Sequence, residues 1–237
     1  MEIERMISEE NRGNQGFKSN SLVQGILDES LNDESNQSFN PILSRLQLIS
    51  NSSNISILTE NLILTSATCV IPQVIEALDV SCIICAAPEL PYSPLSNAVA
   101  YHKVNVRDSC DAAISTYFDE VADIIDQETS LGGRVLVFCV AGVSRSATLC
   151  LAYLMKYHQL TLQEAYNHVK KIRPRIHPNC GFFQQLIEYE QALFNTTSVK
   201  MVFNEFLQTT IPEVYDDEYK QIRMFSRKRR DRQDRHK

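Results

Sequence analysis

A cysteine and an arginine stand at the two ends of a short turn within VLVFCVAGVSRSATLCLAYLM, residues 135–155. Cys139 opens the turn, Gly142 lies inside it, and Arg145 closes it. A guanidinium presents a planar fork that fits two phosphate oxygens, and a thiolate is a strong nucleophile. Gly142 has no Cβ, so the backbone there can close tightly and adopt a positive φ. These residue types at this spacing suit nucleophilic attack on a substrate that carries a phosphate group.

The segments on either side of the turn predict a strand before it and a helix after it. Residues 135–138 form a continuous apolar run, which is typical of a strand buried on both faces. The Ala- and Leu-rich residues after Arg145 favour a buried helix. A turn that leads into a helix directs unpaired backbone N–H groups into one hollow, which binds an anion and favours the thiolate of Cys139. The predicted phosphate-binding residues are Val140, Ala141, Gly142, Val143, Ser144 and Arg145.

A longer run, AGVSRSATLCLAYLMKYHQLTLQEAYNHVKKIRPRIHPNCGFFQQLIEYE, resembles the small "atypical" dual-specificity phosphatases of the cysteine-dependent protein tyrosine phosphatase superfamily. Cys139 and Arg145, with Gly142 between them and Ser146 directly after, match the signature loop of that superfamily. The resemblance implies hydrolysis of phosphotyrosine and phosphoserine or phosphothreonine in proteins through a cysteinyl-phosphate intermediate, with no metal or other cofactor. In that scheme the Ser146 hydroxyl donates a hydrogen bond to the returning thiolate.

The reaction also needs a proton donor, because a Tyr, Ser or Thr oxygen leaves poorly unless it is protonated as it departs. Asp108 follows the alternating segment 101–106 and, by the resemblance, matches the position of the family's general acid. Asp111 is the alternative. The predicted catalytic residues are Cys139, Arg145, Asp108 and Ser146.

One residue departs from the family pattern, which usually has His directly before the nucleophile. This chain has Phe138, whose side chain offers neither a charge nor a hydrogen bond. A weak or inactive pseudophosphatase that binds phosphoproteins is therefore an alternative. A third hypothesis, a phosphatase of inositol lipids or RNA ends, calls for extra positive charge in the loop, and residues 140–144 carry no Lys or Arg.

The rest of the chain alternates expected strands with expected helices. Strands are expected in 55–66 (two short ones), 80–87 and 101–106, and helices in 71–78, 114–125, from the capping box at Thr161 to Pro174, and in 181–194. This order predicts an α/β fold with a central, mostly parallel twisted sheet flanked by helices. By the resemblance, this is a protein tyrosine phosphatase-like domain.

Composition divides the chain into three parts. Residues 1–43 are rich in Glu, Asp, Asn and Ser and are expected to be a disordered extension. The catalytic domain is expected over 44–195, and 196–237 form a C-terminal extension with a basic tail.

Charge and hydropathy limit the classes of binding partner and the cellular locations that we expect. The tail 227–237 holds seven Lys or Arg against two Asp, which leaves the rest of the chain at −11 and argues against nucleic-acid binding. No apolar run approaches the length of about 18 residues that spans a bilayer. We therefore expect a cytoplasmic protein that acts on phosphorylated proteins, with the tail as a candidate nuclear localisation segment. The sequence carries no signal for an oligomeric state.

Several further residues stand out by type. Cys82 and Cys85 lie in an apolar strand and are expected to be buried structural thiols. Asn179 is expected to brace the signature loop. Four basic residues are expected to form a solvated helix end, or, if they face the loop, to attract phosphorylated substrates. They are Lys170, Lys171, Arg173 and Arg175.

Overall fold

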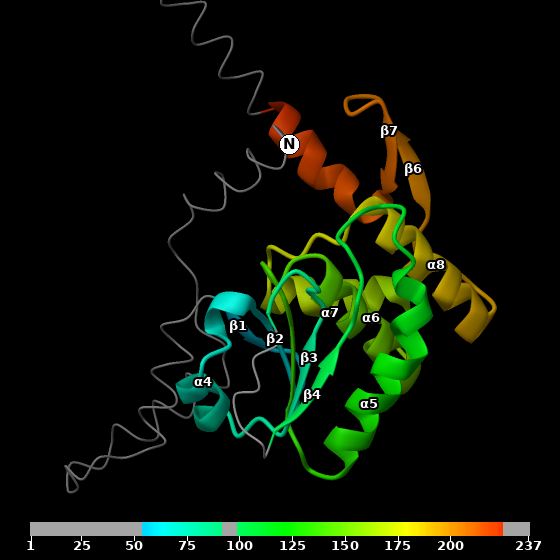
Figure 1. Ribbon diagram of the computed structural model, residues 1–237. Coiled ribbons are helices and arrows are strands. Elements are labelled where there is room, and N and C mark those ends of the chain that lie inside the picture. The colour runs from blue at the N-terminus through cyan, green and yellow to red at the C-terminus, as the bar shows by residue number, and fades with distance from the viewer. Residues whose placement is uncertain (1–53, 92–98, 225–237) are drawn as a thin grey trace, which may run out of the picture.

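The computed structural model describes residues 54–91 and 99–224. The expectations for 1–43 and for the basic tail lie outside the described residues. The centre of the fold is a five-stranded sheet in the order β1-β2-β5-β3-β4 (Figure 1). Its strands are β1 (Ile55–Ile57), β2 (Leu62–Ser66), β3 (Cys82–Cys85), β4 (Ala100–Lys103) and β5 (Val135–Cys139).

Strand β5 lies in the middle of the sheet. It pairs in parallel with β2 on one side and β3 on the other, and β3 pairs in parallel with β4. Within this five-stranded sheet only β1 runs antiparallel. All five residues of β5 are buried, as the continuous apolar run predicts for a strand covered on both faces. The predicted α/β class with a mostly parallel central sheet is confirmed.

Helices cover both faces of this sheet. Helix α6 contacts β5 and β2, and α5 lies beside it, whereas the short α4 lies on the other side (Figure 1). Most of α6 is buried, since its Ala- and Leu-rich residues pack between the sheet and the other helices. The predicted capping box at Thr161 is present. The helices are α4 (Pro72–Ala77), α5 (Phe118–Ser130), α6 (Arg145–His158), α7 (Leu162–Ile172) and α8 (Cys180–Phe194), with 3-10 turns η1 (Ala67–Cys69), η2 (Ile114–Tyr117) and η3 (Glu213–Tyr215).

The residues after α8 form a hairpin and a helical segment that pack on the same body. Strands β6 (Met201–Asn204) and β7 (Thr209–Pro212) pair antiparallel, and β7 contacts α8. The hairpin (orange) and the helical segment to residue 224 (red) lie together at one end of the molecule in Figure 1. Tyr215 of η3 is fully buried, so this extension shares the hydrophobic core.

The structure bears on two further predictions, the burial of Cys82 and Cys85 and the lack of a long apolar segment. Cys82 and Cys85 are both fully buried, and burial raises the pKa of the Cys82 thiol to about 12, as suits a structural thiol. Among the described helices, none combines the length and the apolar character that crossing a bilayer requires.

Candidate active site

The predicted nucleophile lies at the junction of β5 and α6, at the base of the signature loop, residues 139–145. Cys139 is 2% exposed. Two groups donate hydrogen bonds to its Sγ atom, the Gly142 N–H at 3.3 Å and the Ser146 hydroxyl at 3.1 Å. Hydrogen bonds donated to sulfur stabilise the thiolate more than the thiol. The structure therefore brings together three of the predicted residues, although their catalytic roles stay predictions.

Hydrogen bonds from surrounding segments hold the carbonyl groups of residues 140–143 in the signature loop. Each of the four between 140 and 143 accepts a hydrogen bond from a group outside the loop. In a trans peptide the N–H points opposite to the carbonyl, so the following amides face the hollow above the sulfur. Among the described residues, the amides of Ala141, Val143 and Ser144 have no protein acceptor. The bonds run from Ala67 N to Val140 O (3.1 Å), Arg173 Nη2 to Ala141 O (3.1 Å), Arg173 Nε to Gly142 O (2.6 Å) and His177 N to Val143 O (3.0 Å).

Gly142 permits this arrangement because the loop presses against the end of β2. Its φ is +67°, and a Cβ placed there would lie 2.3 Å from the Thr65 carbonyl oxygen. No side chain fits in that space. The predicted positive φ is therefore present, and a close backbone approach adds to it.

The guanidinium of Arg145 is buried and already holds three acceptors. Its Nη1 and Nη2 atoms donate to the two carboxylate oxygens of Glu89 at 2.9 and 2.7 Å, and Nη1 also donates to the Val106 carbonyl at 3.4 Å. Of its five N–H groups, the Nε–H and one Nη2–H stay free, and these share one edge of the plane. The buried Nε atom has no hydrogen-bond partner among the described residues. This free edge is the bidentate edge that a phosphate group would take.

Asp108 faces this free edge. Its Oδ2 atom lies 3.5 Å from the Arg145 Nε atom. Its Oδ1 atom accepts hydrogen bonds from the Ser144 hydroxyl at 2.7 Å and the Asn179 side-chain amide at 2.9 Å. Two donors thus fix one oxygen of the carboxyl group and leave the other toward the hollow. Asn179 is the N-cap of α8, so it braces the acid as well as the loop.

The structure also places two other sets of predicted residues, the alternative acid Asp111 and the basic residues near the end of α7. Asp111, the alternative acid, is exposed, and a hydrogen bond from Ser109 keeps the pKa of its carboxyl below the usual range. The solvated helix end is wrong for Arg173, which is 1% exposed because it donates to loop carbonyls and to β1. Arg175 is half-buried and donates to Ala141, whereas Lys171 is exposed as predicted.

Two residues of the site, Glu89 and Arg173, are not among the predicted catalytic residues; Glu89 is not predicted at all, and Arg173 is predicted only as one of four basic residues near the end of a helix. Arg173 carries a signal that could have found it. The buried positions of α7 are 162, 165, 166 and 169, and the same spacing continues to 173, so this residue lies on the core face of the helix. Glu89 lies in a Pro-rich loop with no periodic pattern, and no comparable signal identifies it.

A family model described as "Dual specificity phosphatase, catalytic domain" matches residues 62–192, more than half of the chain. The chain belongs to the dual specificity phosphatase family. Dual specificity protein phosphatase 14 of Mus musculus is 47% identical over 150 residues, which cover 63% of this chain and 74% of that protein. Dual specificity protein phosphatase 21 of Homo sapiens is 46% identical over 126 residues, covering 53% and 64%. The crystal structure of human DUSP28(Y102H) matches with a TM-score of 0.57 and 30% identity, covering 59% and 96%.

This dual specificity phosphatase is a protein phosphatase with Phe138 directly before the predicted nucleophile, Cys139. The Phe138 side chain is 5% exposed and belongs to the core of β5, and its carbonyl accepts a hydrogen bond from Ala86 N at 2.8 Å. The two donors to the Cys139 sulfur come from other residues, so the sulfur keeps its hydrogen bonds without help from position 138.

Proposed function

We propose that this phosphatase works through a cysteinyl-phosphate formed on Cys139. The thiolate attacks phosphorus, the bond from phosphorus to the Tyr, Ser or Thr oxygen breaks, and the phosphoryl group passes to sulfur. The free edge of Arg145 and the inward-facing amides of residues 140–145 hold the equatorial oxygens, whose charge grows in the transition state. We assign this activity to residues 44–195, of which 44–53 lie outside the described residues.

Asp108 acts as the general acid in this proposal. Protonated at Oδ2, it gives its proton to the departing oxygen, while Ser144 and Asn179 hold Oδ1 in place. In the second step the ionised Asp108 accepts a proton from water, and the water oxygen attacks phosphorus. The bond from phosphorus to sulfur breaks, and the Ser146 hydroxyl stabilises the thiolate that returns.

The observation that carries the proposal is the convergence on one hollow. The converging groups are a sulfur with two hydrogen-bond donors, a row of amides without acceptors among the described residues, and the Nε of buried Arg145. That Nε atom has Asp108 at 3.5 Å but no hydrogen-bond partner among the described residues. Such a set of donors without acceptors suits a group with several negative oxygens.

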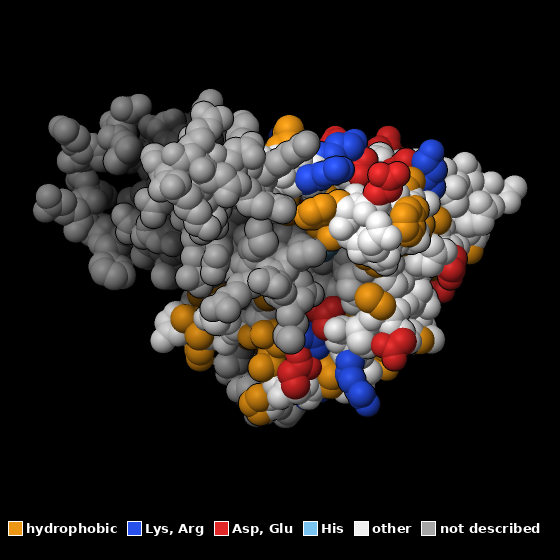
Figure 2. Space-filling view, turned by 90° about the horizontal axis from the view of Figure 1, so that it is seen from above, with side chains coloured by type: hydrophobic (Ala, Val, Ile, Leu, Met, Phe, Trp, Pro, Cys, Tyr) orange, Lys and Arg blue, Asp and Glu red, His pale blue; other side chains and the backbone are white. Residues whose placement is uncertain are grey.

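The substrates we propose are phosphorylated proteins in the cytoplasm, with the basic tail 227–237 serving entry to the nucleus. Figure 2 shows acidic, basic and hydrophobic side chains interspersed on one face of the described residues. Mixed charges of this kind differ from the continuous basic surface of nucleic-acid binding proteins, which supports a protein substrate.

Hydrolysis of a panel of phosphopeptides and of a chromogenic aryl phosphate tests the mechanism. Cys139→Ser should abolish turnover because a hydroxyl at this position is not ionised, and the variant should still bind phosphopeptide. Asp108→Ala should lower kcat by about 10²-fold or more, since it removes the proton donor. Asp111→Ala is the matched control and should leave kcat within about twofold of wild type.

The outcomes separate the open alternatives. Full activity of Cys139→Ser would overturn the mechanism. A larger loss of kcat in Asp111→Ala than in Asp108→Ala would indicate that Asp111, and not Asp108, is the general acid. Wild-type protein that binds phosphopeptide but hydrolyses none would favour the pseudophosphatase that Phe138 leaves open.

A further inference from the structure

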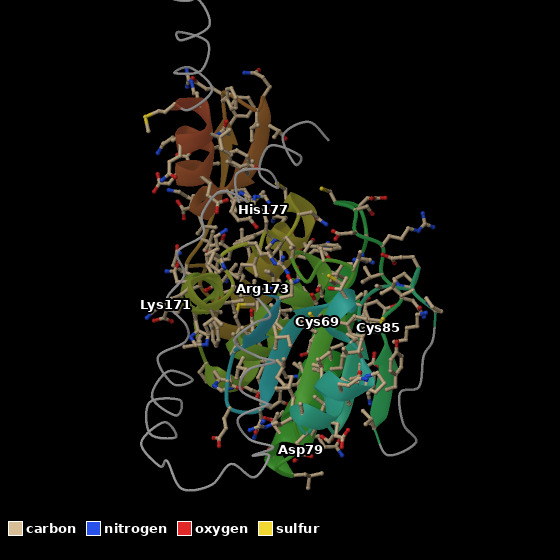
Figure 3. The ribbon with its side chains drawn as sticks, turned by 90° about the vertical axis from the view of Figure 1, so that its left-hand side faces the viewer. Cys69, Asp79, Cys85, Lys171, Arg173 and His177 are labelled. Atoms are coloured by element: carbon tan, nitrogen blue, oxygen red, sulfur yellow. The ribbon has the colours of Figure 1, made fainter. Side chains whose placement is uncertain are left out.

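Arg173 is one of the largest fully buried side chains among the described residues. It is the C-cap of α7, directly before Pro174, and its side chain points inward beneath the signature loop. Figure 3 shows Arg173 in the interior beside Cys69, whereas Lys171 of the same helix lies at the outer edge of the molecule. Arginine is rarely this buried unless it is paired with an opposite charge.

The partners of Arg173 are neutral oxygens. Besides the Ala141 and Gly142 carbonyls, Nη1 donates to the Asn54 carbonyl at 2.8 Å and to the Ser56 hydroxyl at 3.2 Å. No carboxylate pairs with it among the described residues. Burial and the charge of nearby Arg175 lower its pKa to about 10, so the guanidinium stays charged at neutral pH. A buried charge without a counter-ion costs several kcal/mol, which suggests that its opposite charge appears elsewhere in the working site.

In the proposed mechanism the sulfur of Cys139 carries a negative charge before it attacks phosphorus. Gly142 links this sulfur to Arg173, because its carbonyl accepts from Arg173 Nε at 2.6 Å and its amide donates to the Cys139 sulfur at 3.3 Å. Cys69 and Cys150 also lie near the guanidinium. Burial raises the pKa of Cys150, which keeps that thiol neutral. Cys139 differs because its sulfur accepts two hydrogen bonds, and those bonds favour the anion. The thiolate of Cys139 is therefore the counter-ion that the surroundings of Arg173 favour.

The same guanidinium also fixes the geometry of the loop. It holds two successive carbonyls, Ala141 and Gly142, on the side away from the sulfur. Because each amide points opposite to the preceding carbonyl, these two bonds aim the Gly142 and Val143 N–H groups into the hollow. If either peptide turned over, a carbonyl oxygen would face the phosphate and repel it.

We infer that Arg173 is a positioning residue that favours the Cys139 thiolate by its buried charge and keeps the loop amides directed at phosphate. This inference rests on the proposed function, since it assigns to Arg173 a part in forming that nucleophile. Other charged or titratable groups act on the same sulfur: Arg145 and Cys150 from α6, and Arg175 after α7. Glu89 and Asp108 in turn face Arg145.

The test measures the rate of Cys139 alkylation by iodoacetamide as a function of pH in the full chain. Mass spectrometry of the peptides separates Cys139 from the exposed Cys110. Arg173→Met removes the charge at similar length, and the pH midpoint of alkylation should rise by about one unit, a tenfold loss of thiolate at a given pH. Lys171→Met, an exposed cation of the same helix, is the matched control and should leave the midpoint unchanged.

A second variant separates charge from geometry. Arg173→Lys keeps the charge, so the alkylation midpoint should stay within about 0.3 unit of wild type, but it lacks the planar fork by which Nε and Nη2 reach the Gly142 and Ala141 carbonyls. The KM for an aryl phosphate should rise about tenfold in this variant because the loop amides are less well directed. A general loss of stability would not separate the alkylation midpoint from the KM in this way. Circular dichroism measures the stability of each variant in parallel.

A folded Arg173→Met protein with the wild-type midpoint would overturn the role of the charge. If that protein does not fold, Arg173→Lys decides. A shifted alkylation midpoint in Arg173→Lys would overturn the role of the charge. A wild-type KM in the same variant would overturn the role of Arg173 in directing the loop amides. Failure of the proposed function looks different, because it would appear as turnover by Cys139→Ser, whereas alkylation needs no turnover.

Discussion

In the proposed mechanism, Arg145 meets the substrate phosphate with three of its five N–H groups already engaged. Glu89 takes two and the Val106 carbonyl takes a third, which leaves the Nε edge toward the hollow. An arginine side chain has many rotamers, and holding it in one of them before binding removes an entropy cost from the binding step. Glu89 thus acts through Arg145 and need not touch the substrate.

Glu89→Gln should raise the KM for an aryl phosphate more than it lowers kcat. The expected loss in kcat/KM is about fivefold to tenfold, because a half-exposed ion pair contributes about 1 kcal/mol. Steady-state kinetics measure it, with the exposed Glu60→Gln as the control that should match wild type. An unchanged KM in Glu89→Gln would show that Arg145 keeps its orientation alone.

The pH dependence of this difference has a definite sign. The hydrogen bonds from Arg145 lower the pKa of the Glu89 carboxyl. A carboxyl with a lowered pKa keeps its pairing above the ordinary value of about 4.3 and loses it as the pH falls through the lower value in the folded protein. The wild-type advantage over Glu89→Gln should therefore be constant from neutral pH down to that region and disappear only below it.

At the scale of elements, the signature loop depends on the end of β2 as much as on β5 and α6. The register that pairs Ser66 with Cys139 brings the Thr65 carbonyl against Gly142, and the Ala67 amide donates to Val140. The neighbouring strand thus forms part of the wall that shapes the loop. A substitution that alters the contacts between the loop and the end of β2 should therefore affect catalysis even though it does not contact the sulfur.

Gly142→Ala should reduce both stability and activity. Its Cβ would meet the Thr65 oxygen at 2.3 Å, so the loop or β2 must move. Gly132→Ala is the control because its φ is +81° but nothing lies within 4 Å of its Cβ. The control should lose only about 1–2 kcal/mol of unfolding free energy from backbone strain and keep wild-type kcat/KM. Urea unfolding and aryl phosphate kinetics distinguish the two, and equal activity in both variants would contradict a shape role for position 142.

The elements that form the site were largely predictable from sequence, because each has a strong local signal. The apolar run of β5, the capping box of α7 and the spacing from Cys139 to Arg145 all lie within short windows. Glu89 was missed, and the burial of Arg173 beneath the loop was not predicted, because both arrangements depend on tertiary contacts. Residue type alone predicts that both are solvated, and only the packing of the β1 strand and the Pro-rich loop gives them partners.

For the whole molecule, the C-terminal extension is connected to the predicted catalytic residues by a short chain of contacts. The Tyr215 hydroxyl donates to the Pro178 carbonyl at 2.8 Å, and its ring stacks on His177 with a centroid distance of 4.0 Å. His177 and Asn179 in turn donate to the signature loop through Val143 and Ser144. The extension thus supports the segment that holds both the loop and the acid.

Tyr215→Phe should lower the unfolding free energy by about 1–2 kcal/mol, because it leaves a buried carbonyl without its donor. Tyr157→Phe removes a hydroxyl that is bonded to Asp123 near the surface and should cost well under 1 kcal/mol, about the value of an exposed interaction. Circular dichroism in urea measures both, which suits a chain without Trp. A Tyr215→Phe protein as stable as Tyr157→Phe would indicate that the extension adds little to the fold.

The central place of β5 in the sheet should make its amide hydrogens exchange more slowly than those of the segment around Asp108. The amides and carbonyls of β5 are bonded to a strand on each side, so they should exchange only in the rarest and largest openings. Asp108 follows β4, which lies at the edge of the described sheet, and should exchange through smaller, more frequent openings. Deuterium labelling should thus show slow exchange in β5, beneath Cys139, and faster exchange around Asp108. In the proposed mechanism, adaptation to differently shaped phosphopeptides would then fall to the side of the site that holds Asp108.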